Sequence, residues 1–166
     1  MALTKAELIS VLQKEVRILV HLAGKVDARS LDYRPTPKQR STIELLRYLI
    51  VMGPFLTKAI LSGKFDGAAW GVEAAACRDL SLPDTIAAIA AQAEAYPALL
   101  AGVSEDDLRV DVEMFGAKES RGASIVDLVV CGYAAYRTQI FCYLKACGRE
   151  ELNTMNLWAG MDAPAA

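Results

Sequence analysis

The stretch that most constrains the fold is Ser124–Gly148, SIVDLVVCGYAAYRTQIFCYLKACG. Its apolar or small residues alternate in steps of three and four: Ile125, Val129, Gly132, Tyr136, Ile140, Tyr143 and Cys147. This spacing predicts one long helix with one continuous buried stripe. Ser124 with Asp127 resembles a shortened capping box at the start of this helix, and Gly148 suits a left-handed stop.

Three further segments have the same helical periodicity: residues 4–26, 42–62 and 82–103. The first two open with capping boxes, at Thr4 and Ser41, in which a glutamate follows three residues later. Two long connections separate the amphipathic segments. The pattern therefore predicts an all-α fold, a four-helix bundle with long crossover connections rather than a simple up-and-down array.

The connections and the tail are less regular. Residues 63–82 lack sustained periodicity, so we expect a long crossover with a single helical turn near 72–77. In the second connection, apolar and polar residues alternate over 108–114, which predicts a short extended segment there. The tail, residues 153–166, contains Trp158, and we expect it to dock on the body or on a partner.

Composition narrows the class of protein. A chain of 166 residues with 54% hydrophobic residues predicts a single globular domain, 1–166. The formal net charge of -2 and a pI near 5.5 argue against nucleic-acid binding, and no apolar run is long enough to predict a membrane span. The four cysteines form no CxxC pair and no secretory signal is visible, so we expect reduced thiols and a cytoplasmic location.

Two stretches resemble a known family. They are RPTPKQRSTIELLRYL, residues 34–49, and YRTQIFCYLKACG, residues 136–148. The first is similar to the loop and Leu-Leu-x-His helix of the DinB-like superfamily, and the second to its His-Arg-x-Gln signature. This superfamily of four-helix bundles includes thiol-dependent S-transferases that use a divalent metal and a low-molecular-weight thiol. The resemblance implies the same fold over most of the chain.

The resemblance also implies where a metal site would lie. Metal-binding members have one histidine on the second helix and two, four residues apart, on the fourth. These positions fall on Tyr48, Gly132 and Tyr136, and His21 is the only histidine in the chain. We therefore expect no three-histidine site and no metal cofactor, with the two tyrosine rings filling the former cavity. His21, alone at the edge of its helical stripe, is interpreted as structural.

Other candidate residues remain open to more than one interpretation. A pocket between the helices would be lined by Tyr48, Met52, Tyr133, Tyr136, Arg137 and Gln139. If buried, Arg137 would need a partner, and Glu44 or Asp127 could supply it. Cys131 is a conceivable nucleophile, but no histidine is positioned to activate it. The basic residues Arg34, Lys38 and Arg40 form either a solvated loop or an anion-binding edge.

These observations lead to a first hypothesis of function. We expect a metal-free DinB-like protein, a non-catalytic small-ligand-binding or interaction module whose ligand is small and apolar or aromatic. A very apolar second helix and the Trp158 tail suggest a homodimer. The alternative is a thiol-dependent transferase-like enzyme with a non-histidine active site, whose catalytic residues the sequence does not identify. A third hypothesis is a partner protein that acts through the basic edge at residues 34–40.

Overall fold

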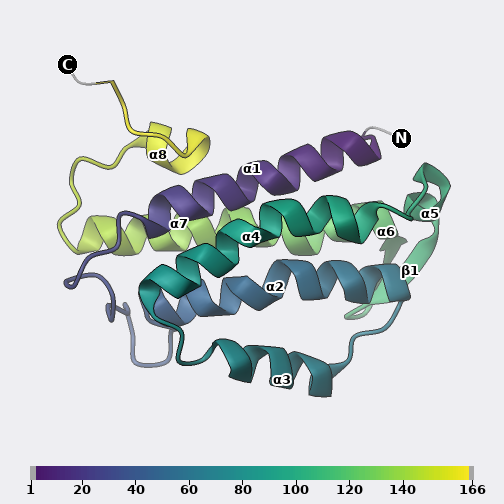
Figure 1. Ribbon diagram of the computed structural model, residues 1–166, viewed down its shortest axis with the longest axis horizontal. Coiled ribbons are helices and arrows are strands. Elements are labelled where there is room, and N and C mark those ends of the chain that lie inside the picture. Colours follow the sequence, from purple (N-terminus) through teal and green to yellow (C-terminus); the bar gives the residue numbers. More distant parts are fainter. Residues whose placement is uncertain (1–2, 165–166) are drawn as a thin grey trace.

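The computed structural model describes residues 3–164, and most of them are helical (Figure 1). The helices are α1 (Lys5–Ala23), α2 (Thr42–Ser62), α3 (Gly67–Cys77), α4 (Leu82–Leu100), α5 (Glu105–Arg109), α6 (Arg121–Ile125), the π-helical segment η1 (Val126–Val130), α7 (Cys131–Ala146) and α8 (Thr154–Ala159). Strands β1 (Asp111–Met114) and β2 (Ala117–Ser120) form an antiparallel hairpin in which Asp111 is opposite Ser120 and Met114 is opposite Ala117.

Four long helical units form the predicted bundle. The helix α1 packs against α4 and α7, and α2 packs against α4, α6 and α7 (Figure 1). Both predicted capping boxes are present, at Thr4 and Ser41. The bounds of α2 agree with the prediction, whereas α1 ends at Ala23 and α4 at Leu100, each three residues early. The predicted bundle with long crossovers is confirmed.

The fourth long helix is continuous but not uniform. It begins at Arg121 with Ser120 as its N-cap, so the start proposed at Ser124 was wrong. Within η1 the backbone hydrogen bonds join residues five apart instead of four. The amide of Cys131, for example, donates to the carbonyl of Val126. Directly after the wider turn, the buried positions are Tyr133 and Arg137 rather than Gly132 and Tyr136, one residue later than predicted. The fully or nearly buried residues of this helix are Ser124, Ile125, Val129, Tyr133, Arg137, Ile140, Tyr143 and Leu144.

The connections contain more structure than predicted. Instead of a single turn, the first holds α3, an 11-residue helix capped by Asp66, whose carboxylate accepts from the amides of Ala68 and Ala69. This helix lies along α2, and none of its residues is buried. In the second connection, the extended segment predicted at 108–114 is a strand only over 111–114, as β1, whereas Leu108 and Arg109 belong to the short helix α5.

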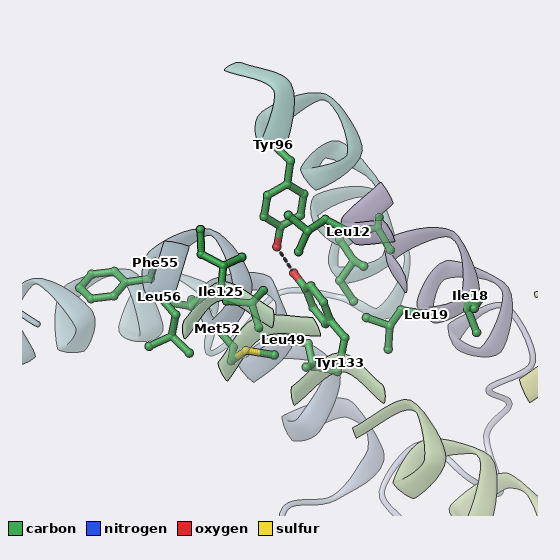
Figure 2. Packing of buried hydrophobic residues seen from close by; sticks show 14 of the residues in the cluster. Leu12, Ile18, Leu19, Leu49, Met52, Phe55, Leu56, Tyr96, Ile125 and Tyr133 are labelled. Atoms are coloured by element: carbon green, nitrogen blue, oxygen red, sulfur yellow. Dashed lines mark hydrogen bonds between the residues drawn. The ribbon is translucent and has the colours of Figure 1, made fainter. Parts of the chain in front are cut away.

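The core lies between α1, α2, α4 and the fourth helix (Figure 2). Two buried tyrosines, Tyr96 and Tyr133, share a hydrogen bond between their hydroxyls. The Tyr133 hydroxyl also donates to Gln92, whose amide donates in turn to the carbonyls of Leu49 and Ile50 at 3.0 Å. Gly53 faces both hydroxyls, and a Cβ there would overlap them, so glycine is required for this close approach.

Two helices in the described part of the chain, residues 42–62 and 121–146, are long and apolar enough to cross a membrane. This is weak evidence for a span, because the core helix of a globular domain passes the same test. Most of the apolar window of α2 is buried among the other helices, which accounts for its composition. The helix over 121–146 is less covered, so part of its apolar surface faces outward.

Candidate functional site

The three positions at which the resemblance implies metal ligands lie where α2 faces the fourth helix. The rings of Tyr48 and Tyr136 meet edge to face, with their centroids 5.3 Å apart. Gly132 lies beside Met52, whose methyl group would be 3.3 Å from a Cβ at that position. The two rings and the Met52 side chain therefore occupy the space between these helices.

These residues do not fit a divalent metal. Burial, followed by the neighbouring Tyr136 hydroxyl, raises the pKa of Tyr48 well above its ordinary value, so its phenol stays protonated and is a poor ligand. Gly132 supplies no donor. Within residues 3–164, no group of three histidine, cysteine, aspartate or glutamate side chains could hold a metal ion. His21 lies elsewhere, with its Nε2 3.0 Å from the Nδ2 of Asn156.

The six residues predicted to line one pocket point in different directions. Tyr48, Tyr136 and Met52 lie together, as described above. Tyr133 is fully buried against α4 through the network with Tyr96. The amide of Gln139 donates to the hydroxyl of Tyr143, which itself donates to the carbonyl of Arg40 at 3.3 Å. The shift at η1 explains this division, because it turns Tyr133 and Arg137 into the core.

Arg137 is buried against α1 and the tail rather than in a pocket. Its Nε lies 3.0 Å from the carboxylate of Glu15, and both side chains are less than 10% exposed. It also donates to the carbonyl of Leu157, and its guanidinium lies 5.1 Å from the ring centroid of Trp158. The prediction that Glu44 or Asp127 would pair with Arg137 was wrong, because Arg137 faces Glu15 on α1. This contact attaches the tail helix α8 to the bundle.

A cavity beside Tyr48 is the best candidate for a binding site. This α2–α3 cavity has a volume of about 380 Å³ and lies between the first half of α2 and α3. Its lining residues are Arg40, Glu44, Arg47, Tyr48, Trp70, Gly71, Ala74, Ala75 and Arg78. Tyr48 is the member of the predicted pocket that lines it.

Aromatic rings and arginines share this cavity. The rings of Tyr48 and Trp70 meet edge to face at 5.8 Å, and the guanidinium of Arg40 lies 4.2 Å above the Tyr48 ring. The Nε of Arg47 donates to the carbonyl of Leu80 at 2.9 Å, which fixes its side chain across the end of α3. With Arg78 the lining holds three arginines and one glutamate, so it carries net positive charge.

The glutamate is already paired. The Glu44 carboxylate accepts a hydrogen bond from Arg34 at 3.0 Å, and it caps α2 by accepting another from the backbone amide of Ser41. The hydrogen bond from the Ser41 amide, followed by the interaction with Arg34, lowers the pKa of Glu44. Of the basic edge, Arg34 is thus neutralised and Arg40 reaches the cavity, whereas Lys38 is exposed. Sequence reasoning missed Arg47, Arg78 and Trp70 as site residues, because it did not predict that α3 is a helix lying along α2.

Comparison with known proteins supports the fold. No protein-family model matches the sequence, and no curated protein matches it. The structure is similar to the crystal structure of YjoA, a DinB-like protein from Bacillus subtilis, with a TM-score of 0.66 and 19% sequence identity. The match covers 88% of this chain and 94% of that chain. The chain therefore has the DinB-like fold.

Proposed function

On this DinB-like fold, we propose that the protein is a metal-free module that binds a small aromatic, negatively charged ligand in the α2–α3 cavity. The observation that carries the proposal is the pairing of Tyr48 and Trp70 with arginines in one cavity. Ring faces accept aromatic ligands, and guanidinium groups recognise carboxylates or phosphates through paired hydrogen bonds. The position that supplies a histidine ligand in metal-binding members here supplies an aromatic wall.

The size and lining of the cavity agree with such a ligand. A volume of about 380 Å³ lies within the range of small-molecule sites. The small residues Gly71, Ala74 and Ala75 leave room on the α3 side. No residue of α3 is buried, and its ring Trp70 contacts the rings of Tyr48 and Phe55 on α2, so this wall of the cavity is aromatic and accessible.

Tryptophan fluorescence tests this proposal directly. The chain has two tryptophans, so Trp158→Phe leaves Trp70 as the sole reporter in the cavity. Titration with benzoate and with its neutral isostere benzamide should give a saturable change, with benzoate binding more tightly. Arg78→Met and Arg40→Met should each weaken benzoate about two- to fivefold, the range for one exposed ion pair. The matched control Arg109→Met removes an exposed arginine on α5, outside the cavity.

The outcomes separate two parts of the proposal. Absence of a saturable change with either compound would contradict an aromatic site at this cavity. Equal affinity for benzoate and benzamide would contradict the role of the arginines while leaving the aromatic site. Added salt should weaken benzoate more than benzamide, because the site is open to solvent.

The alternative function, a thiol-dependent transferase-like enzyme, has a different test. Purified protein would be incubated with a low-molecular-weight thiol and an electrophile such as monobromobimane. Our proposal predicts no rate above that of buffer. A rate that is abolished by Cys131→Ala would support the alternative.

A homodimer also remains a proposal. Packing within the chain accounts for the apolar α2, so the argument for a partner now rests on Trp158, which is 63% exposed. Light scattering during size-exclusion chromatography should give twice the monomer mass of 17.9 kDa. Trp158→Ala should shift that mass toward the monomer if the tail forms the interface, and a monomeric wild type would contradict the proposal.

A further inference from the structure

A second cavity lies at the other end of the bundle from the α2–α3 cavity. In Figure 1 the start of α1, with α5 and α6, lies at the right, whereas α2 begins at the left. This α1–α6 cavity has a volume of about 570 Å³. Its lining residues are Leu3, Leu8, Leu108, Glu119, Ser120, Gly122, Ala123, Val126, Asp127 and Cys131. The candidate function described above does not use it.

The backbone around this cavity has an unusual geometry. Val126 opens the π-helical segment and Cys131 follows it, so the widened turn forms one wall. Single π-helical turns are rare and occur frequently at functional sites. On the neighbouring wall, a Cβ at Gly122 would lie 3.3 Å from the carbonyl oxygen of Leu108, so α5 and α6 approach closely there. The cavity thus lies between the π-helical turn and the close contact of α5 with α6.

The lining combines apolar walls with charge of one sign. Leu8 and Leu108 are buried and supply apolar surface at the base, together with Val126. Among residues 3–164, the charged residues of the lining are Glu119 and Asp127, and none of the lining residues is a lysine or an arginine. Two carboxylates beside an apolar cavity attract an organic cation and repel an anion.

We propose that the α1–α6 cavity binds a small amphiphilic amine, independently of the function proposed above. Its ammonium group would lie between the carboxylates of Glu119 and Asp127, and its alkyl or aryl part would contact Leu8, Leu108 and Val126. The ligand class thus differs from that of the α2–α3 cavity, where the excess charge is positive.

Protection of a thiol tests the proposal in the full chain. Cys131 and Cys142 are both exposed and lie on the same helix, but only Cys131 lines the cavity. Each thiol would be alkylated with iodoacetamide at pH 7 and its rate measured by peptide mass spectrometry, with octylamine, octanol or octanoate present below its micellar concentration. Octylamine should slow alkylation of Cys131 in a saturable manner without changing the rate at Cys142. Octanol should slow alkylation of Cys131 less than octylamine does, and octanoate should slow it least.

Two pairs of variants sharpen the result. Asp127→Asn should weaken octylamine about two- to fivefold, the range for one exposed ion pair, and leave octanol unchanged. Its control is Glu113→Gln, an exposed carboxylate on β1 outside the cavity. Ala123→Phe should fill the cavity and abolish protection by every compound. Ala135→Phe, the same change at an exposed alanine of α7, should not.

The wild-type competition alone can overturn the proposal. No selective protection of Cys131 by octylamine would contradict the site, whatever the variants do. Protection by octanoate equal to that by octylamine would contradict the assignment of a cation. Octylamine is a cation, and the lining of the α2–α3 cavity has an excess of positive charge. A negative result with octylamine therefore does not affect the benzoate experiment, and a negative result with benzoate does not affect this proposal.

Discussion

Removal of Arg137 should destabilise the protein strongly. The change to methionine keeps an apolar chain about as long as the aliphatic stem of arginine, but it removes the guanidinium and leaves the Glu15 carboxylate without its ion-pair partner, 3.0 Å away. The side chains of Glu15 and Arg137 are only 8% and 6% exposed, so water cannot replace the lost charge. Breaking such a buried pair costs about 3–5 kcal/mol. This is a large share of the roughly 5–15 kcal/mol of unfolding free energy that is typical of a domain.

The loss of unfolding free energy caused by Arg137→Met should depend on pH. Burial raises the pKa of Glu15, and the charge of Arg137 opposes that rise. A raised native pKa means that the native state keeps the proton to a higher pH than the unfolded chain, whose glutamate pKa is about 4.3. The contribution of Glu15 to stability is therefore complete below that pH and is lost as pH rises through the native pKa. Arg137→Met should raise the native pKa of Glu15 further and extend this loss to higher pH, because it removes the opposing charge.

Urea unfolding of a double-mutant cycle would measure these effects. The double variant Glu15→Leu/Arg137→Met should recover much of the loss, because no charge stays buried. The control Arg109→Met breaks a 2.7 Å pair with Asp106, whose side chains are 56% and 89% exposed, and should cost less than about 1 kcal/mol. A loss from Arg137→Met as small as that of the control would refute the reasoning. So would a double variant whose loss equals the sum of the single losses.

Three further substitutions test the packing of the core and tail. Gly53→Ala should cost about 1–3 kcal/mol or more in urea unfolding, because the new Cβ overlaps the hydroxyls of Tyr96 and Tyr133; a neutral effect would show that both rings can move. Tyr133→Phe should cost about 1–3 kcal/mol by leaving Gln92 without its donor, and an unchanged midpoint would contradict the network. Trp158→Ala should cost less than about 1 kcal/mol, since the ring is mostly exposed, and a larger loss in a monomer would mean that it packs more closely than described.

Much of the bundle could be predicted from local signals. The capping boxes at Thr4 and Ser41 located the starts of α1 and α2, because each motif satisfies amides that the helix itself leaves free. The helix α3 was not predicted, because its sequence has only a weak helical signal. Its sequence is rich in alanine, and the residues that face α2, Trp70, Ala74 and Cys77, are only half-buried, so its apolar periodicity is weak.

The candidate site was harder to predict than the fold. The spacing of apolar residues placed Gly132 and Tyr136 on the buried stripe, but the π-helical turn rotated Tyr133 and Arg137 into it. A single wide turn leaves no recognisable mark in one sequence. The tyrosine at position 48 was identified as a site residue through the resemblance. The opposite wall of the cavity, which includes Trp70, comes from α3, and α3 was not predicted as a helix.

We propose that aromatic packing occupies the place between α2 and the fourth helix where the resemblance implies a metal site. Elemental analysis of the protein without a histidine tag, followed by calorimetric titration with zinc and nickel, tests it most directly. The account predicts less than stoichiometric metal after purification and no saturable heat, because Tyr48 stays protonated, Gly132 has no donor and no histidine lies at these positions. One equivalent of bound metal that is lost on Tyr136→Phe would contradict it.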